Sequence, residues 1–120
     1  DLGMSRGLGD VYKRQEPIFM GGLKNFEDLE FIGESRGIGL MGALEMVQDK
    51  KNKLPFDGSI SIGERVANKC IENGLICRPL GPSIVLCPPF ITSEEEMGII
   101  FDTLEKTLKE VFSEVKSLGQ

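Results

Sequence analysis

The stretch LICRPLGPSIVLCPPF, Leu75–Phe90, decides how the second half of the chain is arranged. Residues 75–80 form a short apolar run that predicts a β-strand, and residues 84–87 form a second one. The Gly-Pro-Ser sequence between the two runs predicts a turn. Because the second run is apolar on both faces, we expect other elements to cover it on both sides.

Arg78 is the one charged residue in this stretch. We expect it at the end of the first strand, directly before Pro79 and the turn. The planar guanidinium of arginine matches a carboxylate with two parallel hydrogen bonds, so Arg78 could bind an acidic ligand at a strand-to-loop junction. An exposed or ion-paired surface arginine is the alternative, and the pattern alone leaves both open.

A long helix is predicted after the stretch. Ser93 with Glu96 three residues later forms a capping box, and Glu94 and Glu95 place negative charge in the first turn. At about 1.5 Å per residue the helix would span about 35 Å, which is long for a small domain, so part of it could cover a neighbouring domain. Its apolar residues recur at steps of three and four: Met97, Ile100, Phe101, Leu104, Leu108, Val111, Phe112, Val115 and Leu118.

Two more elements are predicted upstream. Residues 62–74 show helical spacing and end in Asn73-Gly74, a good C-terminal stop. Residues 39–47 alternate strictly, which is the period of a strand. One face of this strand would carry Leu40, Gly42, Leu44 and Met46. We interpret residues 30–47 as two strand segments that bend or reverse around Arg36-Gly37.

The order of these elements predicts an α+β fold, with a small, mostly antiparallel sheet, helices packed on one side and a long C-terminal helix. Residues 16–29 are interpreted as a short helix or a loop leading into it. The 120 residues suit one domain, and the 40% apolar content supports a modest core.

Composition excludes several functions. The net charge of −5 argues against nucleic acid as a partner, and no apolar run approaches the roughly 18 residues of a membrane span. Because histidine is absent, Ser-His-Asp and Cys-His nucleophiles and HExxH zinc sites are ruled out within this sequence. The cysteines Cys70, Cys77 and Cys87 form no CxxC pair, which favours free thiols and a cytoplasmic location.

Two further motifs could form catalytic or binding sites. Gly37, Gly39 and Gly42 match the dinucleotide pattern GxGxxG, but no helix follows them, so glycines of a bent strand are the favoured interpretation. The set of Glu34, Arg36 and Glu45 could provide acid–base chemistry. Alternate strand residues also pair on a surface without any chemistry, and we favour that interpretation.

Residues 1–15, DLGMSRGLGDVYKRQ, are Gly-rich and unpatterned. The end of this segment, DVYKRQ, resembles the translation of a transposon end used in sequencing-library preparation. We therefore interpret residues 1–15 as a library-derived or disordered segment, with a flexible native linker as the alternative. Residues 16–120 would then be the domain itself, and the chain would be a piece of a longer protein.

Three segments in series resemble the C-terminal part of class III pyridoxal-phosphate-dependent aminotransferases, with the omega-transaminases most similar. They are GESRGIGLMGALEMVQDK (residues 33–50), CIENGLICRPLG (70–81) and IVLCPPFITSEEEM (84–97). The resemblance extends over about residues 26–115. It implies the small C-terminal domain of a fold type I subunit, which closes over the active site of a homodimer.

The resemblance also implies a function for Arg78, which matches the arginine of the family's RPxG motif. In omega-transaminases this arginine binds the substrate carboxylate and swings away when an apolar amine occupies the site. Relatives that act on ornithine-like substrates usually carry an arginine at the position of Val85, so valine here disfavours that branch. The Schiff-base lysine and the other residues that bind pyridoxal 5′-phosphate lie outside this chain, so no catalytic or cofactor-binding residue is assigned.

The resemblance implies a transaminase that moves an amino group between an amine or omega-amino acid and a keto acid such as pyruvate. The large domain of the same subunit would be the main partner, and this chain alone would be inactive. The alternative from another functional class is a free-standing α+β module that binds a small acid or regulates, without catalysis.

Overall fold

The computed structural model describes residues 16–88 and 93–118, and within them four antiparallel strands form one sheet. The strands are β1 (Ile32–Ile38), β2 (Met41–Met46), β3 (Arg78–Leu80) and β4 (Ser83–Leu86). Their order across the sheet is β1-β2-β4-β3, so β1 and β3 are the edges. The interpretation of residues 1–15 concerns a segment outside the described residues.

The first hairpin reverses three residues later than the sequence predicted. Gly39 and Leu40 form the turn between β1 and β2, and Gly37 lies within β1, paired with Gly42. Gly39 has φ +59°, a left-handed conformation that costs glycine little and other residues more. The expected reversal around Arg36-Gly37 was therefore wrong in position. The three glycines of the GxGxxG match belong to this hairpin, as the strand interpretation expected.

The second hairpin is shorter than its apolar runs. Only residues 78–80 of the predicted strand 75–80 pair in the sheet, because the chain leaves α2 just before them. Ile76 is 83% exposed there, whereas Cys77 is buried. Arg78 is therefore the first residue of β3, not the last residue of a strand. The turn at Gly81 uses φ +58°, which again suits glycine.

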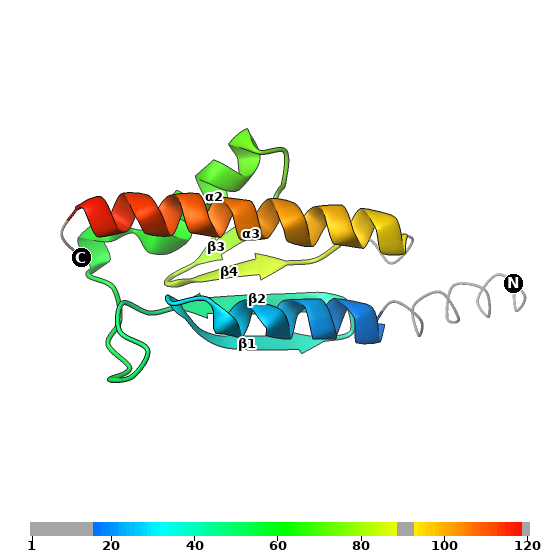
Figure 1. The fold of residues 1–120 in the computed structure, drawn as a ribbon, viewed down its shortest axis with the longest axis horizontal. Coiled ribbons are helices and arrows are strands. Elements are labelled where there is room, and N and C mark those ends of the chain that lie inside the picture. The colour runs from blue at the N-terminus through cyan, green and yellow to red at the C-terminus, as the bar shows by residue number, and fades with distance from the viewer. Residues whose placement is uncertain (1–15, 89–92, 119–120) are drawn as a thin grey trace, which may run out of the picture.

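The helices lie on one face of the sheet (Figure 1). They comprise helical residues 16–25, α2 (Ile62–Glu72) and α3 (Glu94–Ser117), with 3-10 turns η1 (Phe26–Asp28) and η2 (Gly58–Ile60). The helix of residues 16–25 crosses the first hairpin, where an added Cβ on Gly42 would lie 2.6 Å from Leu23. The predicted α+β fold is confirmed. No helix among the described residues is both long and apolar enough to cross a membrane.

The core lies between this face of the sheet and the helices. The sheet contributes alternating residues of the two central strands, β2 and β4. The helix α3 contributes the apolar residues that were predicted at steps of three and four. The fully buried large side chains are Phe19, Leu23, Ile32, Leu44, Met46, Val66, Ile84, Met97, Leu104, Leu108, Val111 and Val115. The apolar stripe of α3 is thus buried mainly within this chain; Leu118, at its end, is 53% exposed.

Polar contacts hold α2 against α3. The Asn73 amide, just after α2, donates 2.8 Å to Thr107 Oγ1 and 3.3 Å to Glu110 Oε1. Lys69 Nζ lies 3.7 Å from carboxylate oxygens of Glu72 and Glu110, and its side chain is 27% exposed. Thr107 is completely buried, so the bond from Asn73 satisfies a hydroxyl that water cannot reach.

Candidate functional site: the open face of the sheet

Arg78 lies on the face of the sheet that the helices leave open. Its neighbour in the register is Val85 of β4, and Val85 also pairs with Ala43 of β2. Paired residues point to the same face of a sheet, and successive residues alternate. Because Leu44, Ile84 and Leu86 face the core, Ala43, Val85 and Arg78 face the other way. Arg78 is exposed, and within the described part of the chain no carboxylate lies within ion-pair distance of it.

The register extends this set into a row across all four strands. Arg36 of β1 pairs with Ala43, so the row runs Arg36, Ala43, Val85, Arg78 from one edge of the sheet to the other. At about 4.8 Å between neighbouring strands, the backbones of the two arginines lie about 14 Å apart. The two arginines flank two small apolar side chains, which are half-buried.

The neighbouring row on this face carries the acidic residues. It runs Glu34, Glu45, Ser83 and Leu80 across the same four strands. Arg36 connects the two rows, with its Nη2 3.5 Å from Glu45 Oε2 and its Nε 4.0 Å from Glu34 Oε2. The side chains of Arg36, Glu34 and Glu45 are 61%, 56% and 37% exposed. Such exposure matches the predicted surface ion pairs and gives no sign of the desolvated carboxylate that an acid catalyst needs.

Apolar side chains surround these charges. Ile38 is 79% exposed, Leu80 69% and Met41 52%, and the register places all three on the open face. We refer to Arg78, Arg36, Glu34, Glu45, Ala43, Val85, Ile38, Met41 and Leu80 together as the open face. Exposed apolar side chains that cluster around a few polar groups are typical of a surface that another protein segment covers.

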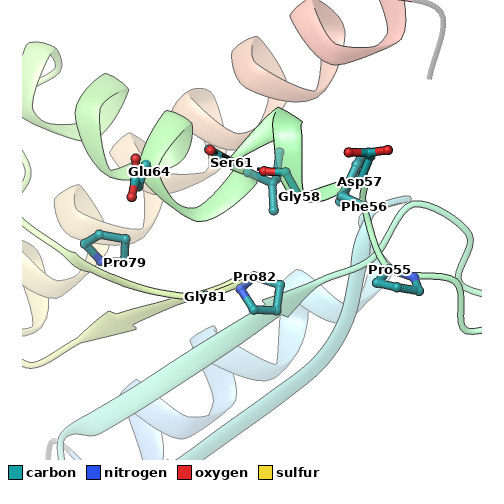
Figure 2. Close-up of a pocket in the computed structure, with 10 residues that line it drawn as sticks. Pro55, Phe56, Asp57, Gly58, Ser61, Glu64, Pro79, Gly81 and Pro82 are labelled. Atoms are coloured by element: carbon teal, nitrogen blue, oxygen red, sulfur yellow. Dashed lines mark hydrogen bonds between the residues drawn. The ribbon is translucent and has the colours of Figure 1, made fainter.

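One pocket among the described residues lies on the helix side instead. It has a volume of about 420 Å³ and opens between the start of α2 and the turn from β3 to β4 (Figure 2). Its ionisable residues are Asp57 and Glu64, and no cation lines it. Hydrogen bonds from the Ser59 backbone and hydroxyl hold the pKa of Asp57 below its usual range. This pocket therefore has the wrong charge for an acidic ligand.

The three cysteines are free thiols. Cys70 and Cys77 are buried, and Cys87 is exposed. A hydrogen bond between the thiols of Cys70 and Cys77 lowers the pKa of Cys70. The same bond, together with burial, raises the pKa of Cys77. Within residues 16–88 and 93–118, no three acidic or cysteine side chains are grouped so that they could bind a metal ion.

The lysines of the described region do not fit a covalent site for pyridoxal phosphate. A Schiff-base lysine is desolvated, and its pKa is lowered so that the neutral amine is available. All described lysines except Lys69 are exposed. Lys69 is half-buried, but its amine lies within 4 Å of carboxylate oxygens of Glu72, Glu110 and Glu114 and is engaged in these ion pairs.

Sequence reasoning singled out Arg78 as a candidate ligand-binding residue but did not predict its relation to Arg36. The strict alternation in residues 39–47 was a usable signal for the face of β2. The pairing of β2 with β4 joins residues about 40 positions apart, and no local pattern reports it.

Comparison with known proteins identifies related chains. The family profile described as "Aminotransferase class-III" matches residues 5–108. The "Adenosylmethionine-8-amino-7-oxononanoate aminotransferase" of Aquifex aeolicus (strain VF5) is 40% identical over 93 residues, which cover 78% of this chain and 20% of that protein.

Solved structures share both sequence and fold with the chain. The omega-transferase from Vibrio fluvialis JS17 is 54% identical with a TM-score of 0.91, over 95% of this chain and 27% of that one. An aminotransferase from Vibrio fluvialis in its PMP-bound form is also 54% identical, with a TM-score of 0.88 over 93% and 25% of the two chains. The chain thus spans about a quarter of the length of these relatives.

Proposed function

Because the chain belongs to the class-III aminotransferases and is similar to their omega-transaminase members, we propose that it forms the small domain of a pyridoxal-phosphate-dependent transaminase subunit. The intact enzyme transfers an amino group between an amine or omega-amino acid and a keto acid such as pyruvate. The small domain closes the active site, and Arg78 binds the substrate carboxylate. The single observation that carries this proposal is the exposed Arg78, with no carboxylate in ion-pair distance among the described residues, on the open face.

The open face supports a position against the rest of the subunit. It exposes Ile38, Met41 and Leu80, whereas the opposite face of the sheet is covered by this chain's own helices. Relatives contain about four times as much chain, which provides the segment that would cover these side chains. Covering this face would remove water around Arg78 and strengthen its attraction for a carboxylate.

The cofactor would be held by the larger part of the subunit. Bound pyridoxal phosphate supplies an electron sink for the reaction. The role of this chain is to orient the substrate through Arg78 and to exclude water by closure. Val85, beside Arg78, and Ala43, one strand further along the row, present no charge or hydrogen-bonding group on their side chains, so they do not compete for its guanidinium. As in the related family, the intact enzyme would be a homodimer.

A chimera tests this proposal. Residues 16–120 replace the matching segment of the Vibrio fluvialis JS17 omega-transferase, and amino transfer is measured with pyruvate and with an aldehyde acceptor that lacks a carboxylate. The chimera is expected to be active. Arg78→Gln is expected to raise the KM for pyruvate about tenfold or more, since hydrogen bonds to charged groups contribute about 1.5–3 kcal/mol. The KM for the aldehyde should change less than about twofold, because that acceptor offers the guanidinium no carboxylate.

Two matched variants complete the test. Arg78→Lys keeps the charge but loses the planar fork, so it should show an intermediate KM for pyruvate. Lys106→Gln removes an exposed positive charge from α3 on the helix side and should leave both KM values unchanged. Equal effects of Arg78→Gln on the two acceptors would contradict carboxylate binding. An inactive, well-folded chimera would contradict the small-domain assignment.

A further inference from the structure

Two carboxylates, Glu34 and Glu45, share the open face with Arg78, and Glu45, the nearer of the two, is a potential competitor for its guanidinium. Glu45 lies one row away on β2, with β4 between it and β3. Two strand spacings and two residues along the strand place its backbone about 12 Å from that of Arg78. Extended arginine and glutamate side chains together bridge such a separation. A guanidinium that is already paired with a fixed carboxylate is less available to a ligand.

In the structure Arg36 holds these carboxylates. Its Nη2 lies 3.5 Å from Glu45 Oε2 and its Nε 4.0 Å from Glu34 Oε2, so both glutamates have their ion-pair partner on β1. Two other cations lie near these glutamates, and in the described part of the chain neither forms an ion pair with them. Lys50 and Lys53 line the hollow beside the two glutamates, but Lys50 Nζ donates to the backbone carbonyls of Glu27 and Leu29. Among the described residues, no ion pair joins Lys53 to Glu34 or Glu45.

The residues between the two arginines provide no polar connection from one guanidinium to the other. Ala43 and Val85 occupy the middle of the row, and neither side chain can relay a charge or a hydrogen bond from one arginine to the other. The open face is thus divided into an ion-paired half on β1 and β2 and a half with an unpaired guanidinium on β3.

We propose that Arg36 is a positioning residue, which retains Glu34 and Glu45 on the β1 side and so leaves Arg78 available to a carboxylate ligand. This inference rests on the proposed function of Arg78 in binding a carboxylate. Whether Arg36 keeps the two glutamates away from Arg78 can be tested without that function. Removal of Arg36 frees two carboxylates. Lys53, which lines the hollow beside them, can take up part of this charge, and Arg78 is the guanidinium on this face, among the described residues, that no carboxylate holds.

The test measures the reactivity of individual arginines in the 120-residue chain. Phenylglyoxal reacts at the guanidine nitrogens, and a carboxylate in contact with those nitrogens hinders its approach. Peptide mass spectrometry then gives a rate constant for each arginine. In the chain without substitutions, Arg78 should react faster with phenylglyoxal than the ion-paired Arg36. In Arg36→Gln the rate at Arg78 should fall about threefold, as expected for a newly formed surface ion pair.

Three further variants separate this role from a purely structural one. Arg36→Lys keeps a cation beside the glutamates and should leave the rate at Arg78 near that of the unmodified chain. The triple change Arg36→Gln, Glu34→Gln, Glu45→Gln removes the competitors and should restore it. Glu34→Gln with Glu45→Gln alone should accelerate Arg36 and leave Arg78 nearly unchanged.

Arg65 serves as the internal reference, because its Nε donates 2.7 Å to the Ile60 carbonyl on the helix side. An unchanged rate at Arg78 in Arg36→Gln would overturn the proposal, as would a triple variant that stays slow. A parallel rise or fall at Arg65 would also overturn it, because it would indicate a general structural change. If these rates behave as expected while Arg78→Gln leaves the KM for pyruvate unchanged in the chimera, only the proposed function fails.

Discussion

Gly63 shows how a single missing side chain permits the packing of α2. A Cβ added at this position would lie 2.3 Å from the Gly81 carbonyl oxygen and 3.1 Å from that of Ser83. Both are backbone atoms of the second hairpin, so they cannot rotate away as the end of a side chain could. The close approach places the start of α2 directly on the hairpin that carries Arg78.

Gly63→Ala is therefore expected to destabilise the chain although alanine favours a helix. Overpacking costs about 1–3 kcal/mol, which exceeds the gain of about 1 kcal/mol from helix propensity. Gly98→Ala in α3 is the matched control, since nothing lies within 4 Å of its added Cβ. It should gain about 0.5–1 kcal/mol. Urea denaturation of both variants measures the difference, and equal effects would argue against the close contact.

Ser93 and Glu96 form the capping box predicted for α3. Glu96 N donates 3.1 Å to Ser93 Oγ, and Ser93 N donates 3.1 Å to Glu96 Oε1. The bonds from the Ser93 backbone and side chain hold the pKa of Glu96 below its usual value of 4.5. A depressed pKa in the folded state stabilises the chain above pH 4.5, and this contribution is lost as the pH falls through the folded-state value.

Ser93→Ala is expected to cost about 1 kcal/mol of stability at pH 7. It should also move the pKa of Glu96 toward 4.5, although the backbone N–H at position 93 still donates to the carboxylate and keeps part of the shift. Ser93→Thr retains a capping hydroxyl and is the control. Carboxyl ¹³C shifts followed from neutral to acidic pH give the pKa directly. A Glu96 pKa that is the same in all three proteins would contradict the capping role.

At the scale of elements, α2 and α3 are joined by a polar contact that packing alone does not require. Asn73→Ala removes the hydrogen bond to Thr107 Oγ1, a buried hydroxyl that still donates 2.8 Å to the Thr103 carbonyl. The expected loss of stability is about 1–2 kcal/mol, because a buried acceptor is left without its donor.

The control for this variant is Asn52→Ala. The Asn52 amide donates 2.8 Å to Asp49 Oδ2 within an exposed loop, where water replaces the lost bond. Its effect should stay within about 0.5 kcal/mol. Thermal unfolding followed by circular dichroism distinguishes the two variants. If both lose the same stability, Asn73 does not link the helices.

At the scale of the whole molecule, this chain should not bind pyridoxal phosphate covalently. When the purified chain is mixed with the cofactor and dialysed, we expect no absorption band from a covalent lysine–cofactor adduct near the edge of the visible range. The reason is that the described lysines are exposed, apart from Lys69, which faces three glutamates. The chimera provides the positive control. A stable lysine adduct of the chain alone would refute the assignment of cofactor binding to the rest of the subunit.

Much of the architecture was readable from local patterns. The capping box and the apolar residues at steps of three and four predicted α3, and Asn73-Gly74 predicted the end of α2. Alternation predicted that Leu40, Gly42, Leu44 and Met46 share one face, and the structure shows that this face is the core. Each of these signals depends on residues within a few positions of one another. The errors were local too: three glycines near residue 37 permit a reversal at more than one place, and the apolar residues 75–77 precede β3 without pairing.

The relation between Arg36 and Arg78 was outside the reach of such patterns. Residue type and neighbouring motifs were sufficient to single out Arg78 as an arginine that could bind a carboxylate. Its place in one row with Arg36, and its separation from Glu34 and Glu45, depend on β4 pairing with both β2 and β3. That register is set by burial of Leu44, Ile84 and Leu86 against the helices, a contact between distant segments that forms only when the whole domain packs.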